Sequence, residues 1–179
     1  MKLSIPTFDD FKLFLKENAD VNKGTEQVDT AAFIGKLPFK FPFITDDHMG
    51  WSANEQAVVL PVREIPMTIL HEAWHYFMAP PDMLKYNNYG LPTPIGGERM
   101  KEERKRDGVR EEEAVCYLTI ATAMELHLPI AAIMDEVEYA NLIEPFVHEK
   151  ANSRKEYAAI MELIESRSLS RFGLKVSLP

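Results

Sequence analysis

The sequence contains only one cysteine, Cys116, among its 179 residues. A lone cysteine can form neither an internal disulfide nor a multi-cysteine zinc cluster, so a reducing compartment is expected and any zinc site must use other ligands. Basic side chains are also fewer than acidic ones: 20 lysines and arginines stand against 28 aspartates and glutamates, which gives a net charge of −8. Without a positive field to attract a polyanion, nucleic acid is not expected as a partner.

A long apolar run is missing as well. No stretch approaches the roughly 18 consecutive apolar residues that a membrane-spanning helix needs. Asp9, Asp10 and Lys12 interrupt the N-terminal segment where a signal peptide would have its apolar region. The chain is therefore expected in the cytoplasm, without a membrane partner. Its 46% apolar and 27% charged residues are typical of a globular protein, and its length fits one domain over residues 1–179.

What the sequence does contain is mostly helical periodicity. Helices are expected at about residues 8–18, 66–78, 110–128, 129–146 and 153–169. Gln56–Val62 is short and β-branched and predicts a strand. The alternation of Phe39, Phe41 and Phe43 predicts an extended segment within residues 31–51, where two prolines mark an edge or irregular strand. The expected fold is α+β and mostly helical.

Residues 81–106 are rich in proline, glycine, asparagine and charge and lack a clear period, which is typical of a functional loop or flap. Asp107 and Gly108 are expected to separate this flap from the next helix. Residues 1–50 are expected to pack on the core as an N-terminal extension. The aromatic residues of the stretch LPFKFPFITDD are expected to pack in the core or at an edge, with a partner-docking surface as the alternative. The last nine residues predict a short strand or a tail.

The stretch REIPMTILHEAWHYFM, from Arg63 to Met78, carries a His-Glu-x-x-His motif within an expected helix. Positions i and i+4 of a helix project from the same face, so His71 and His75 direct two imidazoles to one point, where zinc can bind with bonds of about 2.0–2.1 Å. Glu72 follows His71 around the helix. It is expected to deprotonate a zinc-bound water, the nucleophile, whose pKa the metal lowers to roughly 7.

The competing interpretation is a core helix that contains three polar residues by chance. The residues around the motif are apolar on nearly all sides, so the helix is expected to be buried. Burying two imidazoles and a carboxylate without partners costs free energy, and a metal ion supplies the partner. The metal interpretation is therefore favoured.

A hydrolytic zinc site needs a third protein ligand and one open position. No third histidine follows at the metzincin spacing, so a carboxylate from the run Glu111–Glu113 is expected. Glu113 shares its face with the most apolar stripe of the helix and is the preferred ligand, with Glu112 as the second choice. Glu111 is expected in solvent, where an acidic side chain complements the helix dipole.

Two stretches, LPVREIPMTILHEAWH and EEEAVCYLTIATAMELHLP, resemble the ImmA/IrrE family of gluzincin-type metallopeptidases, in which HExxH is followed by a glutamate in an EA helix. Glu113-Ala114 matches the EA pair. The resemblance implies a compact zincin-like fold, in which a short twisted sheet lies with its edge strand beside the active-site helix. It also implies His71, His75 and Glu113 as ligands and Glu72 as general base.

The expected function is zinc-dependent hydrolysis of a protein or peptide substrate, which would pair in extended form along the strand at Val58–Leu60. The oxyanion of the transition state needs a further donor. Five side chains are chemically able, and the sequence does not rank them: His127, His148, Tyr86, Tyr89 and Tyr117. The alternative function is a catalytically silent regulatory or protein-binding module that keeps the zinc fold.

Overall fold

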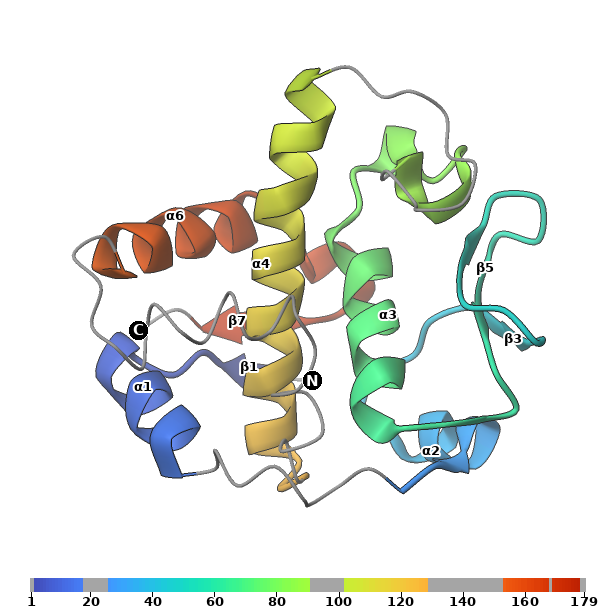
Figure 1. Cartoon of the computed structure of the whole chain (residues 1–179), viewed down its shortest axis with the longest axis horizontal. Helices are drawn as coiled ribbons and strands as arrows, with labels where there is room; N and C mark the ends of the chain where they lie inside the picture. The colour runs from blue at the N-terminus through green and yellow to red at the C-terminus, as the bar shows by residue number, and fades with distance from the viewer. Residues whose placement is uncertain (1, 18–25, 91–101, 129–152, 168, 178–179) are drawn as a thin grey trace.

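The structure is a mostly helical α+β fold (Figure 1), as the helical periodicity of the sequence predicts, and the expected fold class is therefore confirmed. The computed structural model describes all residues except 1, 18–25, 91–101, 129–152, 168 and 178–179. Its helices are α1 (Phe8–Glu17), α2 (Thr30–Lys36), α3 (Pro66–Met78), α4 (Glu102–Glu125) and α6 (Ser153–Ser166), with short helical turns η1 (Pro81–Met83), η2 (Asn87–Gly90) and η4 (Leu169–Phe172). Its strands are β1 (Lys2–Ser4), β2 (Val28–Asp29), β3 (Phe43–Thr45), β4 (Gly50–Ser52), β5 (Ala57–Leu60), β6 (Arg63–Glu64) and β7 (Lys175–Ser177). The helix expected at 129–146 lies outside the described residues.

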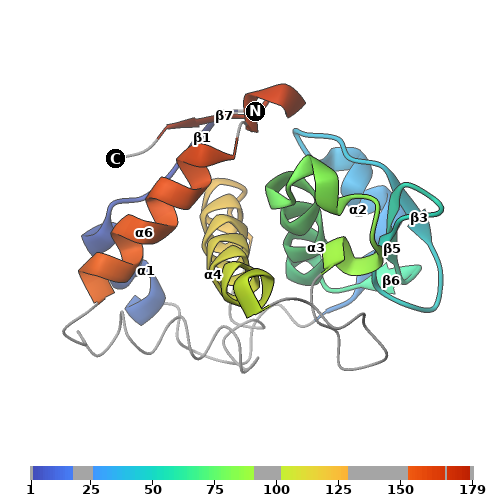
Figure 2. The ribbon, with the colours of Figure 1, turned by 90° about the horizontal axis from the view of Figure 1, so that it is seen from above.

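The long helix α4 runs through the middle of the molecule, with α3 beside it (Figures 1 and 2). On the other side of α4 lie α6, which packs against it, and α1. The sheet that contains β3 and β5 lies beyond α3, together with α2. The two helices that carry the candidate ligands therefore pack directly on each other at the centre of the fold.

The sequence of α3 explains both of its ends. Pro66 occupies the first turn, where its missing N–H is not needed and its fixed φ suits a helix. Pro80 disfavours a helical conformation for Ala79, whose N–H caps the last turn by donating to the carbonyl of His75 at 2.9 Å. The helix expected at residues 66–78 is confirmed, and its apolar side chains are buried.

The three-stranded sheet has the order β3-β5-β4, with β5 parallel to β3 and antiparallel to β4. The strand expected within Gln56–Val62 is confirmed, since β5 is formed and fully buried. Both edges of β5 are paired, so the expected pairing of a substrate along Val58–Leu60 is wrong. A β-branched run predicts a strand but carries no information about its neighbours. The outer edge on this side of the sheet belongs to β4.

No helix was expected before the three phenylalanines, but α2 forms there. Asp29 caps this helix, its side chain accepting a hydrogen bond from the N–H of Ala32 at 2.8 Å. An aspartate before a short apolar run is a capping signal, but a helix of seven residues shows too few turns for its period to stand out in the sequence. Phe39 and Phe41 are buried, which confirms their expected packing in the core.

Helix α4 begins at Glu102, well before the start expected near Arg110. The charged residues 102–106 were expected in the flap, and Asp107 and Gly108 were expected to break the chain, but all of them are helical. Glu, Lys and Arg are good helix formers, and one interior glycine costs only about 1 kcal/mol. A long packed helix outweighs that local signal. The rest of the flap contains η1 and η2. Its residues 91–101 lie outside the described part of the chain.

The N-terminal segment joins the core at two places. β1 pairs in parallel with β7, with Leu3 opposite Val176, so the alternative of a short C-terminal strand is confirmed. Phe11 on α1 is fully buried, and its ring centroid lies 4.1 Å from that of Tyr117 on α4. Within the described part of the chain, no helix combines the length and apolarity needed to cross a bilayer.

One buried hydrogen bond links α3 to α4 directly. The indole Nε1 of Trp74 donates to Oγ1 of Thr122 at 2.9 Å, while the Thr122 hydroxyl donates to the carbonyl of Leu118 at 2.7 Å. Trp74 and Thr122 are both fully buried. This contact helps to fix how α4 is rotated relative to α3, and hence which of its side chains face that helix.

We expect Thr122→Val to lower the free energy of unfolding by about 1–3 kcal/mol, the usual cost of a buried donor left without its acceptor. The donor in question is the Trp74 N–H. Thr119→Val is the matched control, because the buried Thr119 hydroxyl donates to the carbonyl of Val115 in the same helix and does not serve Trp74. Urea denaturation followed by tryptophan fluorescence measures the free energy of unfolding of both variants. If Thr122→Val and Thr119→Val lower that free energy equally, a specific role for the Trp74 hydrogen bond is contradicted.

Candidate metal centre

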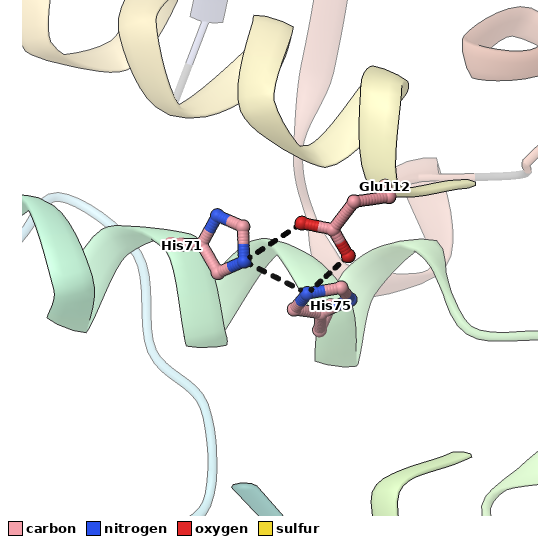
Figure 3. A group of neighbouring side chains, drawn as sticks. All are labelled: His71, His75 and Glu112. Carbon is pink, nitrogen blue, oxygen red and sulfur yellow. Dashed lines mark hydrogen bonds and ion pairs between the residues drawn. The ribbon is translucent and has the colours of Figure 1, made fainter. Parts of the chain in front are cut away.

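Helix α3 turns two imidazoles toward α4 (Figure 3). His71 and His75 lie one helical turn apart, with ring centroids 4.6 Å apart and Nε2 atoms 2.9 Å apart. Their side chains are only 14% and 10% exposed. The two nitrogens therefore converge on one point, as the i, i+4 spacing predicts.

The third side chain of the cluster is that of Glu112 on α4. Its Oε1 lies 3.1 Å from Nε2 of His71 and its Oε2 lies 3.2 Å from Nε2 of His75, so the carboxylate bridges the two rings (Figure 3). Within the described part of the chain, these three residues form a group whose ligand atoms all lie within 4.8 Å of one another. The structure corrects the choice among the three glutamates: Glu112, and not Glu113, faces the histidines.

The criterion that favoured Glu113 was the apolar stripe on its face of the helix. From Ala114 to Ala123 every residue of α4 is buried, so apolar character does not distinguish one face from another. The rotation of α4 against α3 decides which glutamate meets the histidines, and tertiary contacts such as the hydrogen bond from Trp74 help to set that rotation. Sequence periodicity carries no information about it.

Glu111 was expected in solvent, but it is buried. Its side chain is 4% exposed, and its Oε1 accepts a hydrogen bond from Nη2 of Arg167 at 2.5 Å. Arg167 follows α6, so a segment distant in the sequence supplies the positive charge that a buried carboxylate requires. The expectation for Glu111 is therefore wrong, because the partner of this carboxylate, Arg167, lies outside α4 and the pattern within one helix does not reveal it.

Burial and charge interactions shift the pKa values of Glu112 and His75 in opposite directions. Burial would raise the pKa of Glu112, but hydrogen bonds and charge interactions with His71 and His75 hold that pKa well below its usual range. Burial would also lower the pKa of His75, but the Glu112 carboxylate, with smaller contributions from Glu72 and Glu111, raises it above its ordinary value. An ionised carboxylate thus favours a proton on the imidazole. A bound cation would take the place of that proton, because histidine ligates metals in its neutral form.

The donor atoms suit a divalent cation. Two imidazole nitrogens and a carboxylate oxygen are ligand types of hydrolytic zinc sites, which leave one of four positions for water or substrate. Tetrahedral ligands at bonds of about 2.0–2.1 Å lie about 3.3 Å from one another. The separations here are 2.9, 3.1 and 3.2 Å. The cluster could therefore hold a metal ion after small side-chain shifts.

Two further side chains border the cluster. Cys116, one turn along α4 from Glu112, directs its S–H toward Oε1 of that residue at 3.8 Å. Tyr89 from η2 is buried and stacks on His75, with ring centroids 6.0 Å apart. Burial, followed by the charge of Glu72, raises the pKa of the Tyr89 hydroxyl well above its usual value. This hydroxyl is therefore protonated at neutral pH and can donate a hydrogen bond.

Of the five side chains named as possible oxyanion donors, Tyr89 is the one that stacks on a histidine of the cluster. The Tyr117 hydroxyl donates to the carbonyl of Pro6 at 3.0 Å, on the side of α4 that meets the N-terminal segment. Tyr86 and His127 are exposed, and His148 lies outside the described residues. Tyr89 comes from a segment without periodicity, so spacing gave no signal for its position.

We expect Glu112→Gln to weaken zinc binding by at least about 100-fold, because a neutral amide replaces the charged ligand. Glu113→Gln makes the same chemical change at the next position and should stay within about threefold of the wild type, since it removes no ligand. Competition with a chromophoric chelator measures both affinities, supported by elemental analysis. A larger loss in Glu113→Gln than in Glu112→Gln would contradict the ligand assignment.

Comparisons of this chain with protein-family models, with curated protein sequences and with solved structures gave no match. The likeness to ImmA/IrrE metallopeptidases rests on the sequence motifs alone. What the structure itself establishes is a group of two imidazoles from α3 and one carboxylate from α4 that could hold a metal ion.

Proposed function

We propose that this protein is a zinc-dependent metallopeptidase that hydrolyses peptide bonds in a protein or peptide substrate. One observation carries the proposal: the donor atoms of His71, His75 and Glu112 converge to separations of 2.9–3.2 Å from two separate helices. Two histidines and a glutamate, with a fourth position left open, form the ligand set of one group of hydrolytic zinc sites. Glu72 completes the HExxH motif and is not a member of the ligand group.

Each side chain has a distinct part in the proposed reaction. When bound, zinc lowers the pKa of water to roughly 7 and polarises the scissile carbonyl. Glu72 accepts a proton from the attacking water as its oxygen bonds to the carbonyl carbon. It then passes that proton to the nitrogen as the C–N bond breaks, so that a carboxylic acid and an amine are released.

We further propose that the enzyme is similar to the ImmA/IrrE metallopeptidases. An HExxH helix packed against a buried helix that provides a glutamate supports this proposal. The register differs by one residue, because the EA pair of the motif is Glu113-Ala114 and the carboxylate beside the histidines is that of Glu112. The proposal of a zinc hydrolase rests on the site, whereas the proposed family rests on the motifs.

We expect Glu72→Gln to retain zinc and to lower kcat for cleavage of fluorescein-labelled casein by roughly 10²–10⁴-fold, the usual size of general acid–base catalysis. Release of labelled fragments measures the rate, and elemental analysis measures the zinc. Glu125→Gln, at an exposed position at the end of α4, is the matched control and should leave both unchanged.

Two outcomes would count against this proposal. Equal rates in the wild type and in zinc-loaded Glu72→Gln would contradict the role of Glu72. If zinc-loaded wild-type protein cleaves neither casein nor the proteins of a cell lysate after long incubation at high concentration, the hydrolase proposal is wrong. The catalytically silent regulatory module then replaces it.

A further inference from the structure

Two asparagine side chains from η2 cover the outer edge of β4 and the residue that follows this strand. The N–H of Trp51 donates to Oδ1 of Asn88 at 3.1 Å, and the N–H of Ala53 donates to Oδ1 of Asn87 at 3.0 Å. Trp51 lies opposite Val58 in the pair with β5, and its N–H is directed away from that strand toward Asn88. Ala53 is the first residue after β4, at the start of the turn. In an extended chain, residues i and i+2 present their N–H groups on the same side, where a further strand would pair.

The side-chain amides thus stand in for the peptide groups of a neighbouring strand. An Asn side chain ends in an amide whose C=O accepts a hydrogen bond as a backbone C=O does. The two acceptors serve donors two residues apart, one in β4 and one directly after it, which is the spacing with which an extended polypeptide adds to a sheet edge. An extended chain and η2 would therefore compete for the same two donors, Trp51 in β4 and Ala53 directly after it.

Close packing holds η2 in this position. The indole Nε1 of Trp51 donates to the carbonyl of Leu84 at 2.9 Å, between η1 and η2. Gly50 has a φ of +130°, and a Cβ at this position would overlap Oδ1 of Asn88. The approach of Asn88 to β4 is therefore compatible with glycine and not with a larger residue at position 50.

The covered edge adjoins the metal cluster. The ring of Tyr89, the residue after the two asparagines, stacks on Trp51 with centroids 5.5 Å apart and on His75 with centroids 6.0 Å apart. Tyr89 is 3% exposed. It therefore connects the edge of β4 to a ligand of the candidate metal centre, and a polypeptide that paired with β4 would pass beside that centre.

The backbone of η2 is in a conformation that side chains rarely adopt. Asn88 has φ 49° and Tyr89 has φ 56°, so two consecutive non-glycine residues are left-handed. Asparagine tolerates this region, but tyrosine rarely occupies it. Such strain persists where the surrounding contacts enforce it, and here those contacts are with Trp51, Gly50 and His75. Release of η2 would relieve the strain.

We infer that η2 is an internal competitor of the substrate: an extended polypeptide pairs with the N–H groups of Trp51 and Ala53 only when Asn87 and Asn88 leave them. This inference rests on the proposed function, because it takes a polypeptide as the ligand. It replaces β5, both of whose edges are paired, with β4 as the strand that receives the substrate. It also identifies a contact that restrains activity in the isolated protein.

The test compares zinc-loaded proteins that all carry Glu72→Gln, so that bound polypeptide is not consumed. Asn87→Ala with Asn88→Gly removes both amides, and glycine keeps the left-handed backbone at position 88 accessible. We expect the Kd for fluorescein-labelled β-casein, measured by fluorescence anisotropy, to fall at least about tenfold, which is about 1.4 kcal/mol. Asn54→Ala, in the exposed turn after β4, is the matched control and should bind as the parent protein does.

A conservative variant and a second measurement distinguish the loss of the two hydrogen bonds from a general disturbance of the fold. Asn87→Asp with Asn88→Asp keeps an acceptor oxygen at each position and should retain the weaker binding of the parent. Hydrogen exchange of the Trp51 and Ala53 amides should be slow in the parent, fast in the variant without the amides, and slow again after casein is added. An unchanged or higher Kd in a folded variant, or amides that casein does not protect, would overturn the inference.

Measuring casein cleavage by proteins that retain Glu72 tests the proposed function independently of this inference. If the variant without the amides binds casein more tightly but cleaves nothing, the competition stands and the hydrolase proposal fails. If the wild type cleaves casein and neither Kd nor KM responds to removal of Asn87 and Asn88, the hydrolase proposal stands and the competition is overturned.

Discussion

The carboxylate of Glu112 connects the two central helices of this protein. It lies between the two imidazoles that α3 presents, so the candidate metal centre exists only because α3 and α4 pack at one particular rotation. The hydrogen bond from Trp74 to Thr122 supports that rotation from within the core, and the ion pair of Glu111 with Arg167 supports it from the C-terminal segment. The chemistry of the site thus depends on packing at some distance from it.

The sequence predicts those parts of the site that are local. Pro66 and Pro80 mark the ends of α3, and the spacing of His71 and His75 places both rings on one face whatever surrounds the helix. The third side chain of the candidate centre is not local. Glu111, Glu112 and Glu113 are identical in type and consecutive in sequence, yet one is buried against Arg167 and the next faces two histidines. Only the contacts of α4 with other segments distinguish them.

The dependence on contacts between distant segments also explains why the predictions for the sheet and for the flap were wrong. A β-branched run identifies β5 as a strand, but its two partners come from a segment interrupted by prolines, so its central place in the sheet could not be predicted. The flap has no hydrophobic period, although two of its asparagines accept hydrogen bonds from Trp51 in β4 and from Ala53 directly after it. The contacts of this segment with β4 and His75 are visible only in the folded chain, and its sequence alone does not predict them.

The division of the ligands between two helices has a thermodynamic consequence. An ion held by α3 and α4 together binds the folded chain and not the unfolded one, so by mass action it adds to stability in proportion to the logarithm of its concentration. Each tenfold rise in free ion above its dissociation constant contributes about 1.4 kcal/mol to folding. The centre would therefore act as a reversible cross-link across the core, and the amount of available ion would help to determine how long the folded protein persists.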